Sequence, residues 1–358
     1  YITLIVENLD NTCKDTISQM VEIFDRPIAN FLLQDNMICL GETAYFFDSS
    51  YNVNQWSYDF GDGNINLLYN NPTHVYQEAG SYNIVLSVIT DEGCQDSMVK
   101  NITIKSIPVV DFTFENTCQG QETVFTNTSS INDGQIASIE YTFNNNSLDS
   151  VSTHVFNQYG IFDIELTAIS NNGCIGSNSK KIEIYPKPIT RFTAINLCYG
   201  DQTAFNNLSF IPHGDIISYI WDFDSNAYAN TENTEYRFSS SELFNVNLTS
   251  VSDMGCKDIE TKKIKIHELP SNNFKTPNYI CLEDKVELHY INDSNNSNAV
   301  KWYYDFGDGY TSIFKNPQHT YKEIGLFDIG LEVISSEGCR NDTIMKSIIQ
   351  VYPNPITD

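Results

Sequence analysis

The sequence contains little positive charge: 20 Lys and Arg residues stand against 46 Asp and Glu residues, which gives a formal net charge of −26 over 358 residues. A chain this acidic repels nucleic acid and anionic lipid, so we expect neither as a partner. The sequence also lacks any apolar run of about 18 residues, so we expect no membrane insertion. Aromatic residues make up 13% of the chain, which is too many for a disordered protein.

Cys-x-x-Cys pairs, which are typical of zinc and redox sites, are absent although the chain contains nine cysteines. In a β-rich sequence this usage indicates disulfides and an oxidising compartment. The cysteines form two series whose members lie 79 to 83 residues apart. The first series is Cys13, Cys94, Cys174, Cys256 and Cys339, and the second is Cys39, Cys118, Cys198 and Cys281.

An internal repeat of the same length explains the two cysteine series. A Tyr-Asp-Phe-Gly-Asp-Gly motif at residues 58–63 recurs at 304–309. An Asn-Pro-x-His-x-Tyr motif at residues 71–76 recurs at 316–321, and a Gly-x-aromatic-x-Ile motif follows both copies. Weaker copies lie between them, with Thr-His-Val-Phe at 153–156 and Trp-Asp-Phe-Asp at 221–224.

Proline-marked boundaries divide the chain into four full repeats. Runs of β-favouring residues alternate with Gly and Asn-Pro turns, and no segment shows a helical apolar stripe. We therefore predict an all-β chain of tandem antiparallel β-sandwiches in an extended row without a shared core. The repeats are residues 25–106, 107–186, 187–269 and 270–352, called repeats 1 to 4 below. Residues 1–24 match the last strands of a truncated repeat and 353–358 the start of a further one, so we expect a window from a longer array.

The motifs at residues 58–63, 71–76 and 80–86, with their copies in repeat 4, resemble those of the PKD domain, an immunoglobulin-like β-sandwich. The resemblance covers nearly the whole chain, although repeats 2 and 3 depart from it in the acidic turn or the His segment. Tandem PKD repeats with an added cysteine pair are similar to giant secreted surface proteins of Bacteroidota, which are often cargo of type IX secretion. The resemblance implies a non-catalytic, rod-forming stalk of an extracellular adhesin or appendage on the cell surface.

The same resemblance leaves a second function open, an accessory spacer or substrate-binding module of a secreted hydrolase such as a chitinase or protease. The partners that it implies are neighbouring repeats of the same chain and a homo-oligomeric bundle. A glycan or cell-surface target would be bound through other domains, at the distal tip. A third interpretation is that the repeats themselves bind glycan through exposed aromatic residues.

The resemblance also implies where the cysteines lie. In a seven-stranded immunoglobulin-like unit, Cys39 would lie at the pole opposite Cys94, about 30 Å away. A disulfide needs Cα atoms within about 7 Å of each other. The implied bridges therefore join adjacent repeats, as Cys39–Cys174, Cys118–Cys256 and Cys198–Cys339. Cys13, Cys94 and Cys281 would need partners in repeats that are absent or only partly present in this segment. Pairing within a repeat, such as Cys39 with Cys94, and reduced thiols remain alternatives.

No residue is expected to be catalytic. The Asp-Phe-Gly triplets at residues 59–61 and 305–307 are shared with kinases, but the other kinase motifs are missing. No spacing singles out a pair of carboxylates for glycoside hydrolysis. A tight hairpin turn is the better interpretation of the Gly-Asp-Gly sequence.

Metal ligands and cofactors are not expected either, with calcium as the one alternative. Asp59 and Asp62, like Asp305 and Asp308, could supply oxygen ligands to calcium. Two acids at one turn are too few for a full site, so an Asp-capped turn is the expected structure. The histidines that recur in register, His74, His154 and His319, are expected to form a structural hydrogen bond at a strand end.

An Asp-Ser/Thr-aliphatic sequence occurs at four places along the chain. It resembles the O-glycosylation acceptor of Bacteroidota, which makes its hydroxyl residue a candidate modification site. The alternative to modification is that this residue is only a polar residue that opens the last strand. The candidates are Thr16, Ser97, Ser150 and Thr343.

Overall fold

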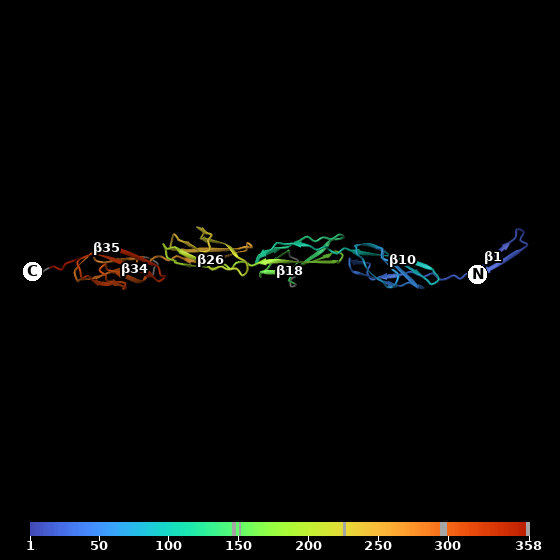
Figure 1. Cartoon of the computed structure of the whole chain (residues 1–358), viewed down its shortest axis with the longest axis horizontal. Coiled ribbons are helices and arrows are strands. Elements are labelled where there is room, and N and C mark those ends of the chain that lie inside the picture. Colours follow the sequence, from blue (N-terminus) through green and yellow to red (C-terminus); the bar gives the residue numbers. More distant parts are fainter. Residues whose placement is uncertain (145–147, 150–151, 225–226, 294–298, 356–358) are drawn as a thin grey trace. The chain divides into compact units, whose positions relative to one another are not determined.

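The computed structural model describes residues 1–144, 148–149, 152–224, 227–293 and 299–355. These residues form strands and turns, with no helix among them (Figure 1). The predicted all-β class is therefore confirmed. The chain divides into two compact units, residues 1–184 and 185–358, each of which contains two repeats. Every repeat has its own cluster of buried hydrophobic residues.

Two short strands precede repeat 1 and pair as an antiparallel hairpin. All their residues are exposed. The hairpin is β1 (Ile2–Glu7) and β2 (Lys14–Gln19).

Repeat 1 is built from two sheets that enclose one core. The three-stranded sheet has the order β3 (Phe31–Leu33), β5 (Thr43–Asp48), β8 (Thr73–Val75). The five-stranded sheet has the order β4 (Met37–Cys39), β10 (Gln95–Lys105), β9 (Gly80–Ile89), β6 (Gln55–Asp59), β7 (Ile65–Asn66).

Repeat 2 keeps the five-stranded sheet and splits the smaller one into two pairs. The larger sheet has the order β12 (Thr117–Cys118), β19 (Ile175–Tyr185), β18 (Gly160–Ser170), β15 (Ile136–Phe143), β16 (Leu148–Asp149). The pairs are β11 (Phe112–Thr113) with β14 (Thr126–Asn127), and β13 (Glu122–Val124) with β17 (Thr153–Val155).

Repeats 3 and 4 follow the same plan. In repeat 3, the smaller sheet has the order β20 (Phe192–Ile195), β21 (Thr203–Asn207), β24 (Thr234–Tyr236). The larger sheet has the order β23 (Tyr228–Ala229), β22 (Ile216–Phe223), β25 (Leu243–Ser252), β26 (Lys257–Lys265). Repeat 4 has β28 (Tyr279–Cys281), β35 (Arg340–Tyr352), β34 (Gly325–Ser335), β31 (Ala299–Asp305), β32 (Thr311–Ser312) in the larger sheet. Its pairs are β27 (Asn273–Lys275) with β30 (His289–Ile291), and β29 (Lys285–Glu287) with β33 (Gln318–Thr320).

One edge of the larger sheet differs from the predicted antiparallel sandwich. β4 pairs with the last strand of its repeat, β10, in a parallel register, and β28 pairs with β35 in the same way. The reason lies in the three residues between β3 and β4, which move the chain from one sheet to the other. A strand that changes sheets without a hairpin reversal meets the last strand in parallel, so the purely antiparallel prediction is wrong here.

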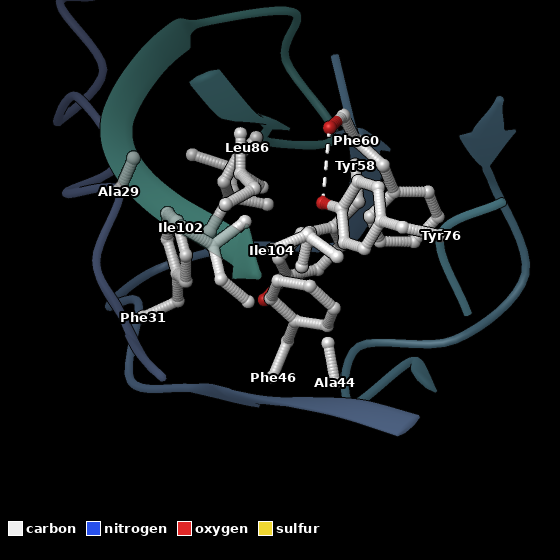
Figure 2. Packing of buried hydrophobic residues seen from close by; sticks show 12 residues of the cluster. Ala29, Phe31, Ala44, Phe46, Tyr58, Phe60, Tyr76, Leu86, Ile102 and Ile104 are labelled. Carbon is white, nitrogen blue, oxygen red and sulfur yellow. Dashed lines mark hydrogen bonds between the residues drawn. The ribbon is translucent and has the colours of Figure 1, made fainter. Parts of the chain in front are cut away.

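The core of repeat 1 follows from the two-residue period of its strands. On β9 the alternate residues Ile84, Leu86 and Val88 are fully buried. They pack against a group of large aromatic side chains that includes Phe46 and Tyr58 (Figure 2). Burying each large side chain contributes about 1.5–3 kcal/mol, so the core alone accounts for a strong preference for this fold.

Candidate functional site: the junctions between repeats

The two ends of the last strand in repeat 1 explain why its cysteines do not pair with each other. Cys39, on β4, lies opposite Lys105 at the C-terminal end of β10. Cys94 directly precedes the first residue of β10, which has 11 residues. At about 3.3 Å per residue, roughly 35 Å separates the two cysteines. A Cys39–Cys94 bridge is therefore excluded, and Cys94 is a free cysteine.

The structure instead joins cysteines of successive repeats. Cys39 of repeat 1 is bonded to Cys174 of repeat 2, with a Cα–Cα distance of 5.6 Å. Cys198 of repeat 3 is bonded to Cys339 of repeat 4, with a Cα–Cα distance of 5.5 Å. The free cysteines of the described residues are Cys13, Cys94 and Cys281. The remaining expected bridge, Cys118–Cys256, would join the two compact units and stays a prediction.

In each repeat one cysteine lies in the hairpin turn before the last strand, and we call it the hairpin cysteine: Cys94, Cys174, Cys256 and Cys339. The residue two places after it contacts the first residues of the same repeat. The Asp96 carboxylate accepts a hydrogen bond from Ala29 N at 2.8 Å. In repeat 3, Asp258 accepts from Thr190 N at 2.9 Å and pairs with Lys187 at 3.1 Å. Burial acts to raise the pKa of Asp258. The contacts with Thr190 and Lys187 lower the pKa by more than burial raises it, so the net pKa lies below the ordinary value.

Repeats 2 and 4 achieve the same anchoring with other residues. In repeat 4, Asn341 Nδ2 donates to the Pro270 carbonyl at 2.8 Å. In repeat 2 the position is Gly176, and a Cβ there would lie 2.3 Å from the Pro108 carbonyl oxygen. The linker backbone therefore packs directly on the strand in repeat 2, where the other repeats use a side chain.

The junction between repeats 1 and 2 has an ionic contact beside the disulfide. Asp133 of repeat 2 accepts from Ser106 N at 2.8 Å and pairs with Lys105 Nζ at 3.2 Å, both at the end of repeat 1. The hydrogen bonds from Ser106, followed by Lys105, lower the pKa of Asp133. A cavity of about 620 Å³ lies beside this contact, with Leu40 and Ile107 in its wall.

The acidic turn of repeat 1 is held by its own backbone and by one histidine. Asp59 accepts from Gly61 N at 2.9 Å, and Asp62 accepts from Asn64 N at 3.1 Å. The second oxygen of Asp62 lies 2.6 Å from His74 Nε2. The His74 ring stacks on Phe60, with ring centroids 4.3 Å apart. The predicted structural hydrogen bond of this histidine is confirmed.

Repeat 4 reproduces this arrangement, and repeats 2 and 3 vary it. His319 lies 2.7 Å from Asp308 Oδ2 and stacks on Phe306. In repeat 2, His154 stacks on Phe143, and in repeat 3 a tyrosine, Tyr236, stacks on Phe223. The stack is therefore common to all four repeats, whereas the part of the chain that the structure describes has the contact between histidine and acid in repeats 1 and 4.

The described residues contain no group of three or more His, Cys, Asp or Glu side chains placed to hold a metal ion. At the acidic turns, both Asp62 oxygens already accept hydrogen bonds within the protein. The expected Asp-capped turn is present, and calcium binding at this turn stays an untested alternative. The described residues also contain no helix long and apolar enough to cross a membrane.

The three candidate modification sites within the described residues lie on separate strands. Thr16 on β2 and Ser97 on β10 are exposed, whereas Thr343 on β35 is half-buried. Ser150 lies outside the described residues. Their modification stays a prediction.

Sequence reasoning missed a lysine that fastens the last strand to the smaller sheet. Lys100 Nζ donates to the Phe31 carbonyl and lies 5.3 Å from the centre of the Phe31 ring. Lys180 and Lys262 make the same two contacts in repeats 2 and 3. The recurrence of lysine six residues after the hairpin cysteine was the available signal, but its carbonyl partner lies about 70 residues away in the sequence.

Comparison with known proteins agrees with this architecture. A family model for the PKD domain matches residues 24–106 and 267–349. The chain carries PKD domains in tandem. The predicted class of tandem immunoglobulin-like domains is thereby confirmed, while their arrangement in an extended row stays a prediction.

Two curated relatives contain segments similar to part of this chain. The pre-pro-metalloprotease PrtV of Vibrio cholerae is 26% identical over 161 residues, which is 44% of this chain and 17% of the relative. Collagenase ColQ1 of Bacillus cereus is 30% identical over 117 residues, which is 32% of this chain and 12% of the relative. The chain thus spans no more than 17% of the length of these relatives.

A solved structure of the PKD1 domain from the Vibrio cholerae metalloprotease PrtV is also similar to part of the chain. It is 26% identical and covers 23% of this chain and 98% of its own, with a TM-score of 0.21.

Proposed function

We propose that the chain is a non-catalytic stalk segment, a rod-forming spacer of a large extracellular adhesin or surface appendage that presents a distal binding tip. The observation that carries this proposal is the disulfide between successive PKD repeats. A peptide linker alone joins two domains at one point and allows them to bend. A second covalent connection at a different place on both domains removes much of that freedom, which suits a spacer under load.

The location that we propose is the cell surface, outside the cytoplasm. Disulfides form and persist in oxidising environments, and this chain has bridges in both compact units. The combination of PKD repeats with a periodic cysteine pair further supports a secreted surface protein of Bacteroidota, exported by the type IX system.

A second function is favoured by the relatives. Both are named as proteases, a metalloprotease and a collagenase, and the matched segments are a small part of each. On that basis the chain would be an accessory spacer or substrate-binding module of a secreted hydrolase. A hydrolase domain encoded within one repeat length of this segment would favour the accessory role, and a longer run of PKD repeats would favour the stalk.

Small-angle X-ray scattering tests the spacer proposal directly. Four sandwiches of about 30 Å each, placed in a row, predict a maximum dimension above about 100 Å. We expect a Cys39→Ser/Cys174→Ser double variant to scatter as a more flexible particle than the parent. Cys94→Ser, which removes a free thiol, is the matched control and should change nothing. A compact particle, or identical curves for parent and double variant, would contradict the proposal.

A further inference from the structure

The outer face of the larger sheet in repeat 4 carries a groove. Directly opposite residues on its neighbouring strands form rows, the first of which is Asp305, Gly330 and Ile344. The next row is Tyr303, Glu332 and Asp342. Together with Ile313 of the loop after β32, these six residues line a groove of about 380 Å³.

Gly330 opens this groove, although the fold does not require a glycine there. Its φ is not positive, and it pairs directly with Asp305 and Ile344, although the register between β34 and β35 shifts just before it, between Phe327 and Ile329. A Cβ at this position would meet the nearest atoms, Asp305 Cβ and Ile344 Cγ1, at 3.6 and 4.0 Å, which are ordinary contacts. Glycine in the middle of a strand weakens the strand and often marks a bulge or the close approach of a ligand. Neither the φ of Gly330 nor the space around it requires a glycine.

The other repeats provide an internal comparison at the same rows. None of them combines a glycine, an aromatic ring and three carboxylates. The rows are Asp59–Val85–Val99 and Ser57–Ser87–Ser97 in repeat 1, Thr142–Glu165–Ser179 and Glu140–Thr167–Ser177 in repeat 2, and Asp222–Asn247–Thr261 and Ile220–Thr249–Ile259 in repeat 3. This combination of lining residues is thus a property of repeat 4 and not of the shared fold.

The groove lining combines apolar surface with uncompensated negative charge. Ile344 and Tyr303 are 65% and 42% exposed, so their apolar surface faces solvent. Of the three carboxylates, Glu332 is paired with Arg340 at 3.0 Å. Asp305 accepts a backbone hydrogen bond from the following turn, and Asp342 forms no ion pair within the described residues. Two carboxylates therefore remain available beside a half-exposed aromatic ring.

We propose that this groove binds a lysine or arginine side chain of a partner polypeptide. The cationic head would lie over the Tyr303 ring, between the carboxylates of Asp305 and Asp342, where ring and acids both attract it. The aliphatic stem of the ligand would fill the space above Gly330, against Ile344, since long basic side chains bury their stems on apolar surface. This proposal does not depend on the spacer role. It gives the chain a protein partner in addition to that role.

Binding of a fluorescein-labelled tetralysine peptide to the full chain, followed by fluorescence anisotropy, tests the proposal. The salt concentration should be about 0.15 M, where attraction between distant charges is screened. The deciding variant is Gly330→Val, which introduces the residue that repeat 1 has in this place and leaves the net charge unchanged. It fills the groove, so we expect about tenfold weaker binding. Tyr303→Ala should weaken binding by about two- to thirtyfold.

Matched changes in repeat 1 separate this site from general attraction to an acidic protein. Val85→Gly opens the equivalent place, where Asp59 is the one carboxylate of the two rows and Ser57 stands in place of the tyrosine, and should leave the affinity of the chain for tetralysine unchanged. Asp342→Asn should weaken binding more than Asp91→Asn, which makes the same change of charge on an exposed turn. The proposal is overturned if tetralysine does not bind, if Gly330→Val binds it as the parent does, or if a neutral chito-oligosaccharide displaces it from the groove.

Discussion

At the residue scale, His74 is defined by two contacts. Its ring lies flat on Phe60, with an interplanar angle of 2°, and its edge meets the Asp62 carboxylate. Tyr76, two residues later, donates its hydroxyl hydrogen to the Phe60 carbonyl at 3.0 Å (Figure 2). The His and Tyr of the Asn-Pro-x-His-x-Tyr motif therefore hold the acidic turn in place, which explains why the two motifs occur together.

This arrangement predicts a pH dependence of stability. Burial acts to raise the pKa of Asp62, but the hydrogen bonds with His74 and Asn64 lower it more, so the folded pKa lies below that of the unfolded chain. A depressed folded pKa means that the contribution is complete above the unfolded pKa, about 4, and is lost as the pH falls through the folded pKa. We expect Asp62→Asn to cost about 1.5–3 kcal/mol at pH 7, the usual contribution of a hydrogen bond to a charged group.

Hydrogen exchange of β8 and β9 at a series of pH values measures this effect locally. The difference between the parent and Asp62→Asn should be constant near neutral pH and should shrink below about pH 4. A difference that grows toward low pH would show that the sign is wrong. Exchange in repeat 3, where Tyr236 replaces the histidine, is the control within the same chain.

At the element scale, the turn after β6 shows why its glycines differ. Both Gly61 and Gly63 have positive φ values, of 82° and 91°. A Cβ on Gly61 would lie 2.6 Å from the Asn83 carbonyl oxygen of β9, whereas a Cβ on Gly63 would meet nothing within 4 Å. The first glycine permits close packing of the turn on the neighbouring strand, and the second serves the turn alone.

The two glycines give a matched pair of substitutions. Gly63→Ala should destabilise repeat 1 by about 1–2 kcal/mol, because only the backbone conformation is affected. Gly61→Ala should cost about 1–3 kcal/mol more, because the methyl group also collides with β9. Protection of β9 amides in hydrogen exchange reports the two costs, and equal effects of both substitutions would contradict the packing argument.

The sequence was informative where a feature depends on local pattern. The alternation in residues 82–88 predicts which side chains enter the core, and Gly-Asp-Gly predicts the turn. The parallel edge of β4 could not be found in this way, because it depends on a crossing between sheets. Lys100 was missed for a related reason, since its partner is a carbonyl far along the chain. The groove above Gly330 depends on residues of four strands, and no single segment indicates it.

At the scale of the whole molecule, the charge of −26 governs encounters between chains. Like charge opposes lateral packing, so the homo-oligomeric bundle that the family resemblance implies would need salt to form. We expect the sedimentation coefficient of the isolated chain to be that of a monomer in dilute salt and to rise with salt concentration if chains associate. A monomer at every salt concentration would argue against a bundle for this segment.

The central claim is that disulfides connect successive repeats, and peptide mapping without reduction tests it most directly. Free thiols are first alkylated, and the chain is then cut after glutamate, which places the three relevant cysteines on different peptides. Cys39 falls on residues 23–42, Cys94 on 93–115 and Cys174 on 166–183. The structure predicts a cross-linked species of 23–42 with 166–183, and an alkylated Cys94. A cross-link between 23–42 and 93–115, or alkylation of Cys39, would contradict the account.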